Sequence, residues 1–271
     1  MDAIFDLVGS RQELTRYTLI GMLIMLRILP ITFITPFLGG KLVPNETRTG
    51  LGLGLTILVF SHAESFQTAP VYLNPLVYIV LMLKELFLGF TIAFVATKLF
   101  YAMEVAGRIL DVMRGSSMAE VQVPELNLRA SPLGDFMFHL LLVLFMVMDG
   151  HIRFIEALFE SFRVVPLDAF PQIQGGFQAW TNAILEYGSS LFAIAFALVF
   201  PGLFASFMTD VVFGMLNRVA PQLNAYFMAM GIKALAGMAM LLFSLSMVVK
   251  AMAQHSSESL TFLERMINLL G

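Results

Sequence analysis

Six charged residues lie within or at the edge of long apolar runs, where charge is costly. On insertion scales each such charge costs roughly 2.5 to 3.5 kcal/mol at a bilayer centre, so each needs a partner or water. We interpret them as members of ion pairs between helices or between subunits, and a proton relay is the alternative. The residues are Arg27, Lys84, Glu85, Lys98, Asp210 and Lys233.

Lys84 and Glu85 are neighbours in the sequence. Adjacent positions of a helix point to different sides, whereas positions three or four apart share a face. The spacing therefore predicts that each of these two residues has its own partner, and that the effects of replacing them add.

A metal site could be drawn around two histidines, because His139 follows Asp135 by four positions and His151 follows Asp149 by two. Neither spacing matches a dedicated zinc motif, and the chain has no cysteine to assist. The sequence also lacks a G-x-S-x-G elbow, a Walker loop and a constellation of paired carboxylates. We expect no enzyme, no cofactor and no metal.

Composition places the chain in a membrane. Of its 271 residues 58% are hydrophobic and only 13% are charged, which is too apolar for one soluble core. The net charge of −3 and the scattered basic residues argue against a nucleic-acid partner. No basic residue precedes Arg11, so the n-region of a cleavable signal peptide is missing. The loops mix basic and acidic residues, which leaves the membrane orientation open.

The pattern predicts an all-α fold of hairpins with proline-broken and overlong helices. We expect a break or kink in the first apolar run, since Pro30 and Pro36 lie inside it. The run at 223–253 would be about 46 Å long as a helix, against a hydrocarbon layer of about 30 Å, so it must tilt, break or leave the bilayer. A helix stop is expected at Asp149-Gly150-His151. The expected segments are 1–16, 17–38, 49–60, 75–103, 136–148, 153–163, 191–216, 223–253 and 260–270.

Four of these elements carry finer expectations. The 1–16 segment is compatible with a short amphipathic helix at an interface. The apolar stripe of 154–162 should lie on the membrane or on a partner subunit. Trp180 fits an interfacial anchor. The 254–258 segment is expected to be a polar tail, and 260–270 a short exposed helix.

The central segment, residues 104–135, connects two membrane-type helices and is polar, glycine-dotted and aperiodic. A connection of this length is usually functional or disordered, and its many apolar residues argue against disorder. We expect it to pack inside a protein assembly. Glu104 and Arg108 at i,i+4 can extend the preceding helix, and the Arg114-Gly115-Ser116-Ser117 run should end it.

Several motifs resemble one family. The most specific is the run from Gly214 to Asn224, which contains Arg-Val-Ala-Pro-Gln-Leu-Asn and is followed by Lys233 and Gly237. Together these positions are similar to the FliR/SctT family, which also includes YscT-like and SpaR-like proteins and supplies an export-gate subunit of type III secretion. Supporting single positions along the chain are Arg27, Pro30, Pro36, Pro44, Arg48, Lys84, Glu85, Gly89, Gly107, Asp111, Gly115, Gly150, His151, Ser161, Phe162 and Pro166.

The resemblance implies a single domain, residues 1–271, that helps to move unfolded proteins across the bacterial inner membrane. The implied partners are SctR/FliP-like and SctS/FliQ-like gate subunits, a SctU/FlhB-like switch protein, exported proteins and lipid. The gate would be a pore-forming spiral, raised in part toward the periplasm. The Arg-Gly-Ser-Ser-Met-Ala-Glu sequence replaces the Asp-Pro that is common in the flagellar branch, which favours the injectisome branch.

The family's pore plug falls on the middle of the central segment. The plug residues implied here are Arg114, Gly115, Ser116, Ser117, Met118, Ala119, Glu120, Val121, Gln122, Val123 and Pro124. The buried charges and inter-subunit contacts implied are Arg27, Lys84, Glu85, Asp210, Arg218, Pro221, Asn224 and Lys233.

Two other classes of protein compete with this interpretation. Proline-broken helices and buried charges would also suit a secondary transporter of ions or small solutes, but the matched halves of such transporters are not evident. A membrane enzyme would need a set of catalytic residues, and the sequence shows none of the motifs named above.

Overall fold

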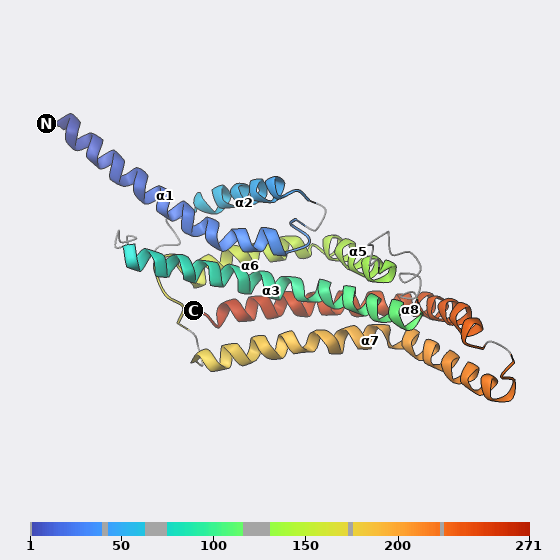
Figure 1. Ribbon diagram of the computed structural model, residues 1–271. Coiled ribbons are helices and arrows are strands. Elements are labelled where there is room, and N and C mark those ends of the chain that lie inside the picture. Colours follow the sequence, from blue (N-terminus) through green and yellow to red (C-terminus); the bar gives the residue numbers. More distant parts are fainter. Residues whose placement is uncertain (1, 40–42, 63–74, 116–130, 173–175, 223–224) are drawn as a thin grey trace. The chain divides into compact units, whose positions relative to one another are not determined.

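A computed structural model describes residues 2–39, 43–62, 75–115, 131–172, 176–222 and 225–271 (Figure 1). In these ranges all regular secondary structure is helical, which confirms the all-α prediction. The helices are α1 (Asp2–Ile34), α2 (Asn45–Phe60), α3 (Pro75–Met113), α5 (Pro132–Val147), α6 (Gly150–Val164), α7 (Gly176–Val219) and α8 (Ala225–Asn268).

The chain forms two compact units. Unit 1 comprises Met1–Thr97, Asp149–Leu185 and Glu258–Gly271, and unit 2 comprises Lys98–Met148 and Glu186–Ser257. Helices α3, α7 and α8 therefore contribute residues to both units. The single-domain organisation inferred from the resemblance stays a prediction.

Among the described residues, four helices are long and apolar enough to cross a membrane, and the bent pair α5 and α6 would make a fifth if it forms one span. This confirms a multi-pass membrane protein. Helices α7 and α8 each have 44 residues. Since a helix rises 1.5 Å per residue, each is about 66 Å long, about twice the thickness of the hydrocarbon layer.

Helix α1 is longer than predicted. It runs without interruption from Asp2 to Ile34 and contains Pro30, so the separate helix expected at 1–16 is wrong. The helix ends just before Thr35-Pro36, as expected from the clash between a proline ring and a preceding residue in helical conformation. Helix α2 packs against α1, which confirms the predicted hairpin.

Helix α3 starts at Pro75, as predicted, and continues past Met103 to Met113, which confirms the predicted extension through Glu104 and Arg108. Helix α5 starts at Pro132, where Ser131 caps it and accepts a hydrogen bond from the Gly134 amide at 3.1 Å. Helix therefore occupies both ends of the central segment: the extension of α3 at its start was predicted, and the start of α5 at Pro132 was not.

Helix α6 carries the amphipathic stripe, which is buried within unit 1. Asp149 adopts a left-handed conformation with φ of 56°, which separates α5 from α6 at the predicted helix stop. Phe154 and Phe162 have no solvent exposure, and Phe154 packs edge-on against Phe37 with ring centroids 4.9 Å apart. The expectation that this stripe lies on the membrane or on a partner is wrong, because the chain's own α1 region covers it.

The C-terminal region also differs from its prediction. Helix α8 continues through 254–258 to Asn268 without a break, and Leu263 and Ile267 are buried in unit 1 rather than exposed. Trp180 is likewise a core residue, since it is 5% exposed and lies against Phe87 with ring centroids 5.5 Å apart. The interfacial-anchor interpretation of Trp180 is therefore wrong.

Candidate functional site

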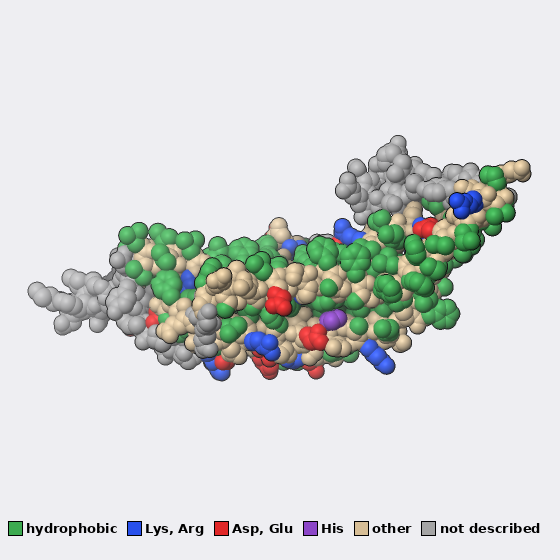
Figure 2. Space-filling view, turned by 90° about the horizontal axis from the view of Figure 1, so that it is seen from below, with side chains coloured by type: hydrophobic (Ala, Val, Ile, Leu, Met, Phe, Trp, Pro, Cys, Tyr) green, Lys and Arg blue, Asp and Glu red, His purple; other side chains and the backbone are tan. Residues whose placement is uncertain are grey.

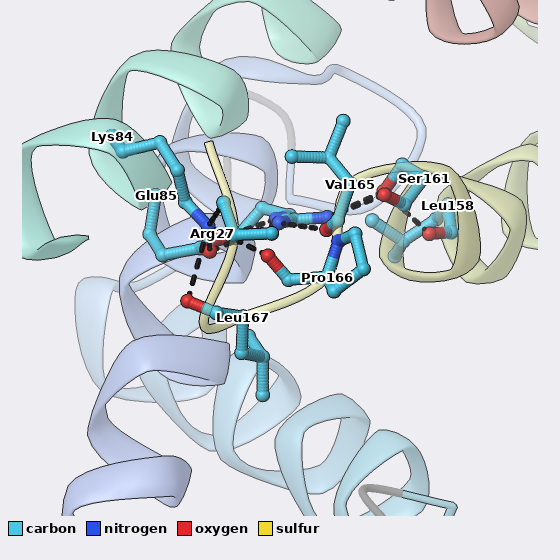
Figure 3. A network of polar contacts seen from close by, with 9 residues as sticks. Arg27, Lys84, Glu85, Leu158, Ser161, Val165, Pro166 and Leu167 are labelled. Atoms are coloured by element: carbon cyan, nitrogen blue, oxygen red, sulfur yellow. Dashed lines mark hydrogen bonds and ion pairs between the residues drawn. The ribbon is translucent and has the colours of Figure 1, made fainter. Parts of the chain in front are cut away.

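A bidentate ion pair joins α1 to α3 inside unit 1 (Figure 3). Arg27 donates from Nε to one oxygen of Glu85 at 2.5 Å and from Nη2 to the other at 3.0 Å, and neither side chain is exposed. Two parallel N–H to oxygen contacts are the strongest form of an arginine–carboxylate pair. The guanidinium also lies 4.1 Å from the ring centroid of Phe162 on α6.

The same guanidinium holds the end of α6. It donates from Nη1 to the Ser161 carbonyl at 2.7 Å and from Nη2 to the Val165 carbonyl at 2.9 Å. The Ser161 carbonyl also accepts from the Val165 amide at 3.1 Å, and a cation at the C-terminal end of a helix is favourable. Arg27 therefore ties α1, α3 and the C-terminal end of α6 together.

Lys84 completes this cluster from α3. Its Nζ lies 2.7 Å from Oε1 of Glu85 and donates to the carbonyls of Pro166, Leu167 and Ala169 at 2.8, 3.1 and 2.9 Å. Each of the two residues has partners of its own, as predicted, Arg27 for Glu85 and the carbonyls after α6 for Lys84, but the two also contact each other, which the spacing did not predict. A long lysine side chain can fold back along the helix, so adjacent positions can share one contact.

We call Arg27, Lys84, Glu85 and Ser161, with the carbonyls of Val165, Pro166, Leu167 and Ala169, the buried charge cluster (Figure 3). One carboxylate in it faces two cations, and five backbone carbonyls accept their remaining hydrogens. The arrangement fixes the connection after α6 onto α1 and α3. The sequence indicated the three charged residues but gave no sign of the carbonyl acceptors, because backbone groups leave no trace in residue types.

The other charged residues of the apolar runs lie in unit 2. Lys98 donates to Ser190 Oγ at 2.6 Å and lies over the ring of Tyr187 at 3.6 Å. Lys233 of α8 pairs with Asp210 of α7 at 2.7 Å, and the Asp210 side chain is 49% exposed. This last contact confirms the predicted ion pairing between helices for Asp210 and Lys233.

The remaining predicted contact residues lie near the connection between α7 and α8. Arg218 is exposed in the last turn of α7 and Pro221 is exposed in the turn that follows, while Asn224 falls outside the described residues. Contacts of any of these residues with other subunits stay a prediction.

The predicted plug is described only at its beginning. Helix α3 ends at Met113 and Gly115 has a φ of 81°, so the predicted helix break at Arg114 and Gly115 is confirmed. Residues Ser116 to Pro124 lie outside the described residues. The Arg114 side chain is 14% exposed, and its Nε and Nη1 have no hydrogen-bond partner among the described residues.

Asp111 is a residue of this region whose role sequence reasoning missed. Its Oδ2 accepts hydrogen bonds from Ser131 Oγ at 2.8 Å and from the Leu133 amide at 2.9 Å. The Ser131-Pro132 pair is a recognisable start of a helix. The link to Asp111, twenty residues earlier, could only be found in three dimensions.

Neither histidine gathers metal ligands. The described part of the chain contains no group of three or more acidic or histidine side chains placed to hold a metal ion. His139 Nδ1 lies 2.7 Å from the Asp135 carbonyl, so it contacts backbone of its own helix rather than the Asp135 carboxylate.

Large apolar side chains cover much of the surface seen in Figure 2. On α7, exposed phenylalanines recur at every fourth position. They are Phe192, Phe196, Phe200 and Phe204. Repetition at this spacing places them on one helix face. An apolar face of this length requires lipid or protein against it.

Comparison with known proteins agrees with this architecture. The family described as "Bacterial export proteins, family 1" matches residues 18–259. The chain is 29% identical to Yop proteins translocation protein T of Yersinia pestis over 98% of this chain and 97% of that protein. It is 24% identical to flagellar biosynthetic protein FliR of Bacillus subtilis (strain 168), over 92% and 95% of the two chains.

A third relative comes from another secretion apparatus. The chain is 24% identical to secretion system apparatus protein SsaT of Salmonella typhimurium, over 86% of this chain and 89% of that protein. The relatives are thus flagellar biosynthetic and secretion apparatus proteins. The match over most of its length shows that the chain belongs to family 1 of the bacterial export proteins, the FliR/SctT family of type III secretion.

Proposed function

We propose that this chain is a structural, pore-forming subunit of a type III export gate, and that it helps to move unfolded proteins across the bacterial inner membrane. The observation that carries the proposal is the family match over residues 18–259 together with helices much longer than one membrane crossing. A helix about twice as long as the hydrocarbon layer suits a complex that is raised in part toward the periplasm.

The plug of this pore is residues 114–124. Non-helical backbone is tolerated at membrane depth only where protein or water surrounds it, and a pore interior supplies both. The side chains from Met118 to Val123 are mostly small or apolar, apart from Glu120 and Gln122, so they can fill a narrow lumen. Gly115, with a φ of 81°, follows the end of α3 at the start of this stretch.

The partners are SctR/FliP-like and SctS/FliQ-like gate subunits, a SctU/FlhB-like switch protein and the exported chain. The exposed apolar faces of α7 and α8 offer room for helical partners, because less of them is buried within this chain than of α1 or α3. The small residues along α8 permit close approach of another helix. Exposed Arg218 and Pro221, with Asn224, supply further contacts. We place the protein in the injectisome branch on the sequence of residues 114–120.

Deletion of Ser116 to Gln122 tests this function. The shortened chain should assemble with its partner subunits, and the assembled gate should conduct small ions in a planar bilayer more than wild type does. Secretion should not be abolished. Deletion of seven residues at 64–70, in the connection between α2 and α3, is the matched control and should leave conductance unchanged.

An assembled deletion variant that conducts no more than wild type would overturn the plug. The segment would then be a contact between subunits. Failure of the chain to assemble with any gate subunit would overturn the broader proposal.

A further inference from the structure

Four oxygen atoms lie around the ammonium group of Lys84 inside unit 1. Oε1 of Glu85 is 2.7 Å from Lys84 Nζ, and the carbonyl oxygens of Pro166, Leu167 and Ala169 are at 2.8, 3.1 and 2.9 Å. The Lys84 side chain is 5% exposed and the Glu85 side chain is not exposed at all. Lys84, Glu85, Pro166 and Leu167 can be followed in Figure 3. We call these four oxygens the oxygen cage.

The oxygen cage holds more oxygens than an ammonium group has hydrogens. Lysine donates three hydrogen bonds, yet four oxygens lie within 3.1 Å of Lys84 Nζ. At least one oxygen is therefore held by the charge of the group as a whole rather than by a hydrogen of its own. A spherical cation attracts oxygens from every direction and places no such limit on their number.

Three of the cage oxygens come from one short turn after α6. The Pro166 carbonyl also accepts from the Ala169 amide at 3.4 Å, which closes this turn. The carbonyls of Pro166, Leu167 and Ala169 all reach the same nitrogen. Carbonyl dipoles that converge on one point repel one another unless a cation lies between them, and potassium channels use backbone carbonyls in this way to replace the hydration shell of the ion. The turn therefore has the form of a cation-binding loop.

The size and charge of the oxygen cage suit a large monovalent ion. Its distances of 2.7 to 3.1 Å are longer than the roughly 2.3 to 2.6 Å that Ca²⁺ prefers and the roughly 2.0 to 2.1 Å of Mg²⁺. Its one carboxylate, that of Glu85, also accepts from Nε and Nη2 of Arg27, so its charge is already shared. A monovalent ion of about the size of ammonium, such as potassium or rubidium, meets both conditions.

We propose that the oxygen cage is a site for a monovalent cation, and that the wild-type chain fills it with its own ammonium group. Lys84 is thus a tethered structural cation and a positioning residue, because it holds the turn after α6 against α3. A neutral amine would lack the charge that keeps four oxygens together, so this role differs from the proton relay considered for Lys84. The site lies within unit 1 and does not depend on the gate function.

Removal of the lysine side chain with the oxygens left in place tests the site. The purified full chain with Lys84→Ala should bind one rubidium ion per chain in equilibrium dialysis with radioactive rubidium, and wild type should bind none. Potassium chloride should raise the melting temperature of Lys84→Ala by several degrees over choline chloride at the same ionic strength. The melting temperature of wild type should be the same in both salts, because the lysine already occupies the cage.

Two control variants separate the oxygen cage from other binding of the ion. Lys84→Met refills the space with an apolar side chain, so it should bind no rubidium and should not respond to potassium. Lys98→Ala removes the other buried lysine of α3, whose Nζ donates to Ser190 Oγ and lies over the Tyr187 ring. This variant has no carbonyl cage at the vacated position and should bind no rubidium either.

The site is ruled out if Lys84→Ala binds no rubidium and melts at the same temperature in both salts, and Lys84 is then a hydrogen-bond donor only. Rubidium binding by Lys84→Met or Lys98→Ala would place the ion elsewhere and would also overturn the proposal. Folding of Lys84→Ala only in potassium or methylammonium would support it. If neither Lys84→Ala nor Lys84→Ser folds in any of these salts, the cage takes no free ion and the proposal fails.

Discussion

Lys84 and Glu85 are adjacent in α3, yet Lys84 Nζ lies 2.7 Å from Oε1 of Glu85 and both side chains belong to one buried cluster with Arg27. The spacing of the two residues predicts that the effects of replacing them add, whereas this direct contact predicts that they do not. Residues that share a network couple, and the coupling is measured by a double-mutant cycle.

We expect the effects of Lys84→Ala and Glu85→Ala on stability to be non-additive by about 1 kcal/mol or more. Glu85→Ala should be the more harmful substitution, about 3 to 5 kcal/mol, because it leaves two buried cations without their carboxylate. Thermal unfolding of both single variants and the double variant in detergent checks this. Effects that simply add would contradict the shared network.

Arg27→Lys should destabilise the protein although it keeps the charge. An ammonium cannot make the bidentate contact with Glu85 and also reach the Ser161 and Val165 carbonyls, so buried acceptors lose their donors at about 1 to 3 kcal/mol each. The melting temperature of the purified protein is the measurement. Arg163→Lys, at an exposed position of α6, is the control and should change it little.

Gly89→Ala should weaken the packing of α3 on α1. A Cβ at Gly89 would fall on the carbonyl oxygen of Arg27, so the backbones must separate. Gly54→Ala is the control, because nothing lies within 4 Å of the Cβ added there and alanine is a better helix former than glycine. We expect a lower melting temperature for Gly89→Ala only, and equal values for the two variants would argue against the close approach.

Leu263→Ala tests the burial of the C-terminal turns of α8. Leu263 is fully buried in unit 1, and truncation of such a residue costs about 2 to 5 kcal/mol. Leu242→Ala, at a residue of α8 that is 61% exposed, should cost far less. The measurement is the free energy of unfolding of both variants. A much larger loss for Leu263→Ala supports a buried end of α8, and equal losses support the short exposed helix that the sequence suggested.

The approximate positions of the membrane-type helices could be predicted from the sequence, since long apolar runs and prolines mark them directly. The end of α3 could also be predicted, because the Arg114-Gly115 run marks it, but the end of α8 could not. Helix α8 continues through the polar residues 254–258 to Asn268, because partners elsewhere in the unit bury one face of its last turns, as Leu263 and Ile267 show.

The partners of the buried charges were harder to predict than the charges themselves. Arg27, Lys84 and Glu85 could be identified from the cost of charge in apolar runs, but their acceptors are backbone carbonyls after α6. Trp180 and the α6 stripe were misplaced for a related reason. An apolar face looks the same in sequence whether lipid, another subunit or the chain's own helix covers it.

The central claim, that this chain is a gate subunit, is tested most directly by affinity purification after expression with and without SctR-like and SctS-like subunits. We predict one assembly that contains all three proteins, with a higher melting temperature than the chain alone, because helical partners cover the exposed faces of α7 and α8. Recovery of a well-behaved homo-oligomer with no gate subunit attached, and with an unchanged melting temperature on co-expression, would contradict the account.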